Sequence, residues 1–312
     1  MRGSIAYQAQ QIFLKSGINK IGESKHQAKE SARADGARTW HEVGKKLGVH
    51  SYATADAYRD VWRSLLKETR NTFNVKNIEK LSKEHVQNFL MLKSNSVAMA
   101  TFNQYAAACE KLETALNMYA RQQGTAREYN FSISSMRKGV SGLRKFEGTR
   151  AYDNPKILIN SIDNPVFKLA ASIQHEGGAR IKEADLINPT QLRGLVNNNG
   201  KIHIDKRGAK GGKPRDIFVS KDSYQQLCEI VSKNGVFDIG SKDKYRQSLK
   251  IAAEKTGQKY TGSHGLRWNF AQNRMDYHMT HGGLTYEAGL VAVSDEMGHV
   301  RGDITEHYLE NF

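Results

Sequence analysis

The stretch MGHVRGDITEHYLE, residues 297–310, says most about the fold and chemistry of this chain. It places a Gly-His pair nine residues before a tyrosine, Tyr308. Two earlier runs are also rich in basic residues: HGLR at residues 264–267 and GARIKE at residues 178–183. Arginine and histidine can hold the oxygens of a phosphodiester while a phenol oxygen attacks its phosphorus. Each run alone is a common pattern, but their order and spacing together predict phosphodiester chemistry.

Composition limits the class of protein. The chain has 312 residues, of which 38% are hydrophobic and 25% charged, as in soluble proteins with two domains. No apolar run approaches the roughly 18 residues of a membrane span, and the N-terminus lacks the apolar core of a secretion signal. Cys109 and Cys228 match no metal-ligand spacing, so we interpret them as reduced packing residues. We expect a cytoplasmic protein without a membrane partner.

The net charge of +15 is unevenly distributed. Residues 1–150 contain 25 Lys and Arg against 13 Asp and Glu, whereas residues 151–312 contain 22 against 19. A basic N-terminal half indicates a polyanionic partner, and nucleic acid is the usual one. Composition also allows an alternative, in which the positive charge only keeps the protein soluble.

Hydrophobic periodicity predicts a helical N-terminal region. Apolar residues recur at helical spacing over residues 51–69, 82–90, 97–123 and 133–146, and Ser82 is a typical helix cap. A four-helix cluster with basic outer faces is the simplest assembly. Residues 1–40 are polar and weakly patterned, so we expect an N-terminal extension there, either a mobile arm or a loosely attached helix.

The pattern changes after the helical region. Helical spacing is lost near residue 148, where Gly and Pro indicate a linker at 148–160. The mixed pattern beyond it predicts helices at 167–176 and 180–187, strands at 192–196, 201–205 and 216–219 with a turn at 197–200, and mainly helix from residue 223. The expected domains are an extension (1–40), a helical DNA-binding domain (41–147) and a catalytic domain (161–312). The fold class is mainly α with a small antiparallel sheet (α+β).

Two pairs of residues suit phosphate binding. Arg180 and Glu183 would share one face of a short helix, either as a surface ion pair or as a phosphate-binding arginine fixed by its carboxylate. His264 and Arg267 repeat this spacing at the start of another predicted helix, whose backbone N–H groups would also face an anion. His264 alone could equally be a structural histidine.

A glycine-rich basic run, RGAKGGKPR at residues 207–215, lies between two predicted strands. It is no nucleotide-binding P-loop, because Pro214 follows Lys213. The run could be a solvated loop or a DNA contact. Lys210 at its tip could protonate a leaving oxygen, and Lys213 is the competing choice.

Tyr308 could be an ordinary aromatic residue near the chain end. A phenol has a pKa of about 10, so as a nucleophile it needs help to lose its proton. No Asp/Glu cluster has the spacing of a two-metal site. With His299 and the arginines upstream, Tyr308 therefore predicts a covalent route that uses no metal and no other cofactor.

The runs resemble the catalytic domain of the tyrosine recombinase (phage integrase) family over residues 160–312. GARIKE is similar to the family's first arginine box, HGLR to its His-x-x-Arg box, and Gly298-His299 with Tyr308 to its Gly-His…Tyr segment. Lys210 falls where the family keeps its strand-hairpin lysine. Residues 80–86 and 100–105 are similar, less specifically, to the family's helical core-binding domain.

The resemblance implies a site-specific recombinase or integrase in which the two domains form a C-shaped clamp around double-stranded DNA. It implies a 3′-phosphotyrosyl link to Tyr308, charge stabilisation by Arg180, Arg267 and His299, proton movement at His264, leaving-group protonation by Lys210, and support from Glu183. It also implies a dimer on an inverted-repeat core site, a tetramer in the synaptic complex, and a nucleoid-associated location. A mobile genetic element is the expected context.

Two features depart from the family pattern. Arg267 and His299 are far apart, which we assign to a loop at 277–285. Few residues follow Tyr308, which puts the usual exchange of tails between protomers in doubt.

The resemblance leaves the DNA contacts and the outcome of the reaction open. Candidate phosphate and base contacts are Arg59, Arg63, Lys67, Arg137, Lys138, Arg144, Lys145 and Lys213, with Thr101, Asn103 and Gln104 nearest to bases. The alternatives are a type IB topoisomerase, a telomere resolvase, or a non-catalytic DNA-binding accessory protein with the same fold.

Overall fold

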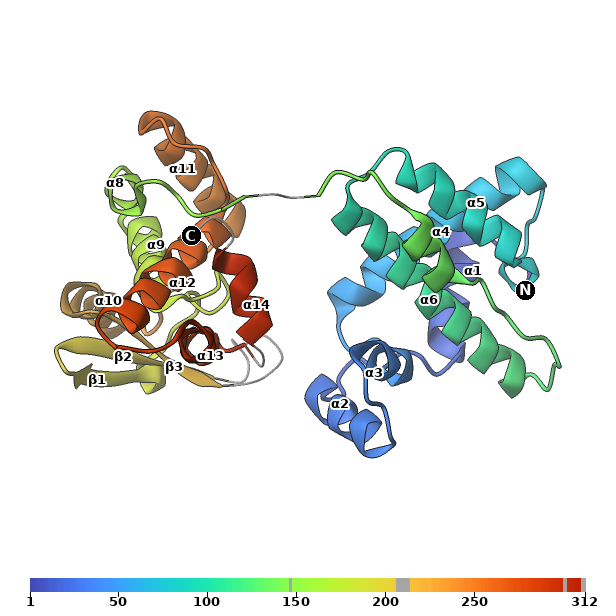
Figure 1. Cartoon of the computed structure of the whole chain (residues 1–312), viewed down its shortest axis with the longest axis horizontal. Coiled ribbons are helices and arrows are strands. Elements are labelled where there is room, and N and C mark those ends of the chain that lie inside the picture. Colours follow the sequence, from blue (N-terminus) through green and yellow to red (C-terminus); the bar gives the residue numbers. More distant parts are fainter. Residues whose placement is uncertain (146–147, 206–213, 300–301, 310–312) are drawn as a thin grey trace. The chain divides into compact units, whose positions relative to one another are not determined.

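The computed structural model describes residues 1–145, 148–205, 214–299 and 302–309 (Figure 1). The chain divides into two compact units, Met1–Phe146 and Glu147–Phe312, and each unit has its own hydrophobic core. None of the helices within these ranges is long and apolar enough to cross a membrane.

Most helices of the first unit pack around one main core. The indole of Trp62 is fully buried, and its Nε1 donates a hydrogen bond of 2.8 Å to the carbonyl of Ala108. The polar atom of this large core side chain is therefore satisfied. The helical elements of this unit are α1 (Ile5–Lys15), α2 (Lys25–Ala34), α3 (Trp40–Lys46), α4 (Tyr52–Phe73), the 3₁₀ turn η1 (Ile78–Lys80), α5 (Lys83–Ser94), α6 (Met99–Gln122) and α7 (Ile133–Gly139).

Helix α1 belongs to this core, in contrast to the expected mobile arm or loosely attached helix at residues 1–40. Ile12 and Phe13 are buried, and the ring of Phe13 lies 6.4 Å from that of Trp62. The buried Gln8 side chain donates to the carbonyl of Lys76 and accepts from the backbone N–H of Ile78. A polar composition concealed the narrow apolar face of α1, which tertiary packing buries.

Local sequence explains where two helices of the bundle begin and end. Ser82 caps α5 as predicted, and the ring of His85 accepts from the backbone N–H of Ser82 in return. Helix α7 stops at Gly139, although apolar spacing continues to residue 146. Gly142 has a φ of +74°, and glycine destabilises a helix by about 1 kcal/mol, so the periodic stretch does not stay helical.

The second unit contains a small sheet with one buried face. Strands β1 (Leu192–Val196), β2 (Asn199–Ile204) and β3 (Arg215–Ser220) are antiparallel in the order β1-β2-β3. Asn197 and Asn198, with φ of +48° and +63°, form the two-residue turn between β1 and β2. Ile202 pairs with Ile217, and both are buried. The three predicted strands are confirmed.

Helices surround this sheet, as the sequence pattern of the second half of the chain predicted. Contacts join α9 to β3 and α10 to β2, and α12 packs against α9 and α13. The helical elements of this unit are α8 (Pro155–Asn160), α9 (Pro165–Gly177), η2 (Pro189–Gln191), α10 (Lys221–Asn234), α11 (Lys242–Lys255), α12 (Ser263–Thr280), α13 (Tyr286–Glu296), α14 (Gly302–Glu306) and η4 (His307–Leu309).

Three segments of the second unit differ from the sequence prediction. The expected linker at 148–160 includes α8, whose Leu158 is buried in the core of this unit. Residues 180–187 form hydrogen-bonded turns in place of a helix, because Leu186 has a φ of +55° and Ile187 pairs with Phe237. The expected loop at 277–285 is shorter, since α12 continues to Thr280.

The packing of α1 leads to a stability prediction. Phe13→Ala should lower the free energy of unfolding by about 3 kcal/mol or more, because it leaves a cavity beside Trp62. Urea unfolding of the full chain, followed by circular dichroism, measures the change. Leu14→Ala is the matched control, since Leu14 is 50% exposed, and it should change the value by less than about 0.5 kcal/mol. Equal effects of the two substitutions would contradict the core position of α1.

Candidate active site

Four segments that are distant in sequence meet in the second unit. Arg180 lies in the turn after α9, and His264 and Arg267 lie in the first two turns of α12. His299 follows α13, and Tyr308 lies in the short 3₁₀ element η4. The five residues were predicted as one site, and the contacts below bring them together.

Arg267 connects three of these segments. Its side chain is fully buried, and its guanidinium donates to the carbonyl of Gly178 and, over 2.5 Å, to the carbonyl of Met297. Its Nη2 also lies 3.0 Å from Nε2 of His299. Burial, with the nearby charges of Arg180 and Arg215, lowers the pKa of Arg267 to about 10, so the side chain remains a cation at neutral pH.

Glu183 is the carboxylate that balances this buried charge. Its Oε1 accepts from Arg180 Nη1 (2.6 Å), and its Oε2 accepts from Arg215 Nη2 (2.7 Å) and from the backbone N–H of Arg180 (2.8 Å). Burial by itself would raise the pKa of Glu183, but Arg215 and Arg180 lower it to about 2. The Glu183 side chain is only 1% exposed, so the alternative of a surface ion pair is wrong.

Arg215 is also part of the site, although no sequence pattern predicted it there. It opens β3, its side chain is 6% exposed, and it donates to the carbonyls of Glu296 and Gly178 as well as to Glu183. Strand-opening arginines are common, and no spacing relates Arg215 to the other runs. Only the approach of β3 to the turn after α9 places it here.

Close packing explains two glycines of the quoted runs. Gly298 has a φ of +65°, and a Cβ there would lie 2.6 Å from Cδ of Arg215. Gly178 has a φ of +60°, and a Cβ there would lie 2.4 Å from the ring of Phe270. A side chain at position 298 would therefore displace Arg215, and one at position 178 would displace the ring of Phe270.

The phenol of Tyr308 faces a histidine. Its hydroxyl lies 3.0 Å from Nε2 of His264, which is hydrogen-bonding distance. Its ring is 5.4 Å from those of His299 and Trp268, and the guanidinium carbon of Arg267 lies 6.0 Å from the ring centre. Tyr308 is 7% exposed. A potential nucleophile, a potential proton acceptor and a cation are thus adjacent.

Lys210 and Lys213 lie outside the described residues, so the structure does not test these two predictions.

The candidate DNA contacts of the first unit differ in how their side chains are held. Arg59 contacts Gln10, Asp56 and the ring of Phe13, so its guanidinium joins α1 to α4.

Other candidate contacts lie on the surface of the same unit. Arg63 pairs with Asp60, and Arg137 pairs with Glu110 over 3.3 Å. The remaining candidates of this unit are exposed: Lys67, Thr101, Asn103, Gln104, Lys138, Arg144 and Lys145. These seven side chains are available to a partner.

Comparison with known proteins identifies the fold. No family model and no curated protein matches the chain. A solved structure of the XerH site-specific recombinase bound to palindromic difH substrate, a post-cleavage complex, has a TM-score of 0.66 and 16% identity over 97% of this chain and 91% of that one. A lambda integrase dimer bound to a COC′ core site has a TM-score of 0.56 and 12% identity, covering 91% of this chain and 76% of that one.

The Tn1549 transposon integrase in complex with circular intermediate DNA is also similar, with a TM-score of 0.53 and 15% identity over 90% of this chain and 93% of that one. The chain therefore has the fold of these recombinases and integrases over most of its length. The expected fold class, mainly α with a small antiparallel sheet, is confirmed.

The arginine cluster leads to a stability prediction. Glu183→Gln removes the carboxylate shared by Arg180 and Arg215 and should lower the free energy of unfolding by about 3–5 kcal/mol, because buried cations lose their partner. Chemical denaturation measures the difference. Asp243→Asn, which breaks the ion pair of a 91% exposed side chain with Arg246, is the control and should cost at most about 1 kcal/mol.

The same substitution has a predicted pH dependence. The pKa of Glu183 is about 2 in the folded chain, below the ordinary value of about 4.3. The stabilisation is therefore fully present above the ordinary value and is lost as the pH falls from about 4 to about 2. The difference between the wild type and Glu183→Gln should shrink over that range. A difference that is independent of pH contradicts the proposed charge state.

Proposed function

We propose that this chain is a tyrosine recombinase that cuts and rejoins DNA at specific sites through a 3′-phosphotyrosyl intermediate. The observation that carries the proposal is the hydroxyl of Tyr308 at 3.0 Å from His264, next to the cluster of Arg180, Arg267 and His299. The fold shared with XerH and the two integrases supports it, since all three structures contain DNA or a DNA site.

The reaction is a transesterification. The Tyr308 oxygen forms a bond to phosphorus as the bond to the 5′ oxygen breaks, and the phenol proton passes to Nε2 of His264. Lys210, outside the described residues, gives a proton to the leaving 5′ oxygen. The reverse reaction, with a 5′ hydroxyl as nucleophile, rejoins the strand without ATP.

Arg180 and Arg267 have different tasks in this proposal. The Arg180 side chain retains 18% exposure and can contact a non-bridging oxygen directly. Arg267 has no exposed surface, and it acts by its charge and by orienting His299. Fixed charges that already face the reacting group need no reorganisation during the reaction, which is the main source of their effect.

The comparisons also support proposals on context and assembly. One of the integrases is that of a transposon, and a mobile genetic element, acting on DNA in the cytoplasm and nucleoid, is the context we propose. Lambda integrase has been seen as a dimer on a core site and as a tetramer on a Holliday junction. We propose a dimer for each inverted-repeat site and a tetramer for strand exchange, with both units contacting the duplex as a clamp.

The nucleophile is tested with a nicked suicide duplex taken from the DNA that flanks the gene. The wild type should form a covalent protein–DNA adduct on a denaturing gel, and Tyr308→Phe should bind the duplex without an adduct. Tyr277→Phe, which alters an exposed tyrosine of α12, is the control and should form the adduct. Binding without an adduct in the wild type would show a non-catalytic DNA-binding protein. Relaxation of arbitrary supercoiled DNA would show a topoisomerase.

The phosphate contact is tested by rate. Arg180→Ala should slow adduct formation about a hundredfold, corresponding to about 3 kcal/mol of lost transition-state stabilisation. Single-turnover time courses at saturating protein measure the rate. Arg246→Ala removes an exposed arginine of α11 and serves as the control, with a rate close to that of the wild type. A similar rate for the two variants argues against the role of Arg180.

A further inference from the structure

Residues 20–48 leave the bundle of the first unit and return to it at the same place. The backbone N–H of Lys20 donates to the carbonyl of Val49 (2.9 Å), and the N–H of Val49 donates to the carbonyl of Ile18 (2.8 Å). Between these points lie α2 and α3, which share a small core separate from that of the bundle. These residues are called the α2–α3 lobe below, and they form a distinct projection of the unit (Figure 1).

Lys111 fixes the lobe on the bundle. This lysine of α6 is buried, and its ammonium donates to the carbonyls of Gly44 (2.9 Å) and Leu47 (2.7 Å). A cation at the last carbonyls of α3 stabilises that helix end. The surface of the lobe therefore keeps a defined orientation relative to α6.

The acidic side chains of the lobe are largely engaged within it. The lobe contains seven Lys and Arg against four Asp and Glu. Glu23 pairs with Lys20 (3.1 Å) and Glu30 with His26 (3.2 Å). The carboxylate of Glu42 accepts backbone N–H groups at the start of α3. Most of the negative charge is thus directed to partners in the lobe itself.

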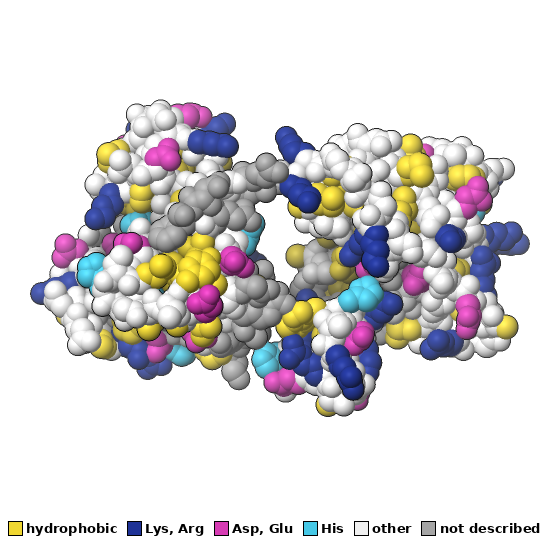
Figure 2. All heavy atoms as spheres, in the orientation of Figure 1, with side chains coloured by type: hydrophobic (Ala, Val, Ile, Leu, Met, Phe, Trp, Pro, Cys, Tyr) yellow, Lys and Arg dark blue, Asp and Glu magenta, His cyan; other side chains and the backbone are white. Residues whose placement is uncertain are grey.

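Five cations of the lobe are exposed, and two of them are engaged: Arg33 lies over the ring of Trp40, and Lys46 donates to the carbonyl of Asp35. Within the described part of the chain, Lys25, Arg38 and Lys45 form no ion pair, and all three are exposed. Figure 2 shows Lys and Arg side chains gathered over α2 and α3. These cations are spread over the surface of the lobe and do not converge on one small ligand. Such an arrangement suits the evenly repeated phosphates of a duplex.

The lobe borders the face where DNA contacts are proposed. A hollow of about 450 Å³ between α4 and α6 is lined by Thr101 and Gln104, two of the three candidate base contacts. A groove of about 900 Å³ between the lobe and α6–α7 is lined by Lys45 and Arg137. Both are lined by Tyr58 and Ala107, so they form one continuous surface.

We propose that the α2–α3 lobe is an additional phosphate-binding element for duplex DNA. Lys25, Arg38 and Lys45 bind the backbone of the same duplex that α4 and α6 contact, and they lengthen the bound segment. The contribution is independent of base sequence, because only phosphates are bound. This inference rests on the proposed function, since it requires that the first unit binds DNA.

The salt dependence of binding tests the proposal. Affinity for a fluorescein-labelled 40-bp duplex is measured by anisotropy between about 50 and 200 mM salt, where log affinity falls by about 0.9 per phosphate contact for each log unit of salt. Lys25→Gln/Arg38→Gln/Lys45→Gln should reduce this slope by about 2 to 3. The rate of adduct formation at saturating protein should stay unchanged.

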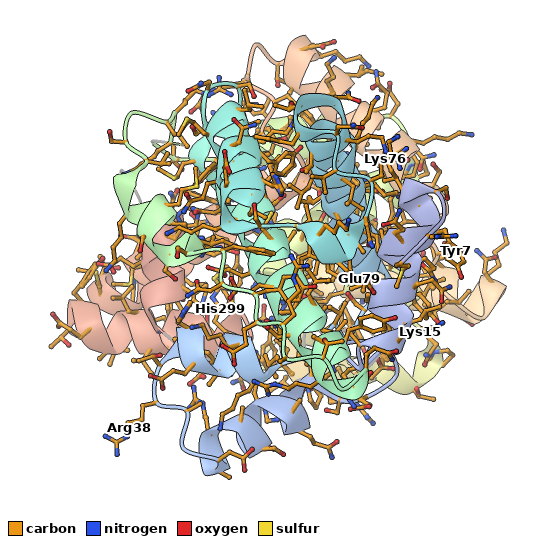
Figure 3. All side chains as sticks on the ribbon, turned by 90° about the vertical axis from the view of Figure 1, so that its right-hand side faces the viewer. Tyr7, Lys15, Arg38, Lys76, Glu79 and His299 are labelled. Carbon is orange, nitrogen blue, oxygen red and sulfur yellow. The ribbon has the colours of Figure 1, made fainter. Side chains whose placement is uncertain are left out.

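A matched variant controls for net charge. Lys15→Gln/Lys76→Gln/Lys80→Gln also removes three exposed cations of the first unit. Figure 3 shows Lys15 and Lys76 on the side of α1, well away from Arg38. This variant should retain most of the wild-type slope, and circular dichroism should show that both variants are folded.

Trp40 provides a second measurement. It lies in the lobe and is 43% exposed, whereas the other two tryptophans, Trp62 and Trp268, are 0% and 1% exposed. Quenching by acrylamide therefore reports mainly on the lobe. Saturation of the wild type with the duplex should reduce the quenching of Trp40.

The outcomes separate this inference from the function on which it rests. Equal slopes for the two triple variants, with quenching of Trp40 unchanged by DNA, overturn the lobe contact while DNA binding and the adduct stand. Failure of the wild type to bind any duplex overturns both proposals.

Discussion

The buried carboxylate of Glu183 is the interaction on which the candidate active site depends. It accepts hydrogen bonds from Arg180 and Arg215, and Arg267 lies in the same cluster through the carbonyl of Gly178. Three guanidinium groups in a low-dielectric interior repel one another, and a single anion with ordered hydrogen bonds makes the arrangement tolerable. The desolvation free energy of these guanidinium groups is offset during folding, before any substrate binds. A phosphate would therefore meet donors that are already oriented.

The same cluster ties the chain together. Arg215 comes from β3, Arg180 from the turn after α9 and Arg267 from α12. Arg215 and Arg267 also donate to the carbonyls of Glu296 and Met297, which lie just before His299. Folding of the sheet, the turn and the last helices is therefore coupled to the formation of the site. The first unit shows a comparable use of a buried cation, because Lys111 holds the α2–α3 lobe through two carbonyls.

Local patterns predicted most elements but failed where distant contacts decide the backbone. Strand spacing, the Asn197-Asn198 turn and the Ser82 cap depend on neighbours in sequence, and they were confirmed. Residues 180–187 read as a helix, yet the pairing of Ile187 with Phe237 and the positive φ of Leu186 keep them in turns. The N-terminal segment appeared polar, and only the core around Trp62 shows that Phe13 belongs to it.

The sequence by itself determined the fold class, the two-part charge distribution and six of the residues that meet in the described site, Glu183 included. These features follow from residue composition, hydrophobic periodicity and motif spacing, all of which can be read directly from the sequence. The tertiary structure alone decided that Glu183 is buried, that Arg215 joins it, and that the Tyr308 hydroxyl faces His264. Burial and hydrogen bonding between residues 32 to 44 positions apart arise only when helices and strands pack, so no local pattern records them.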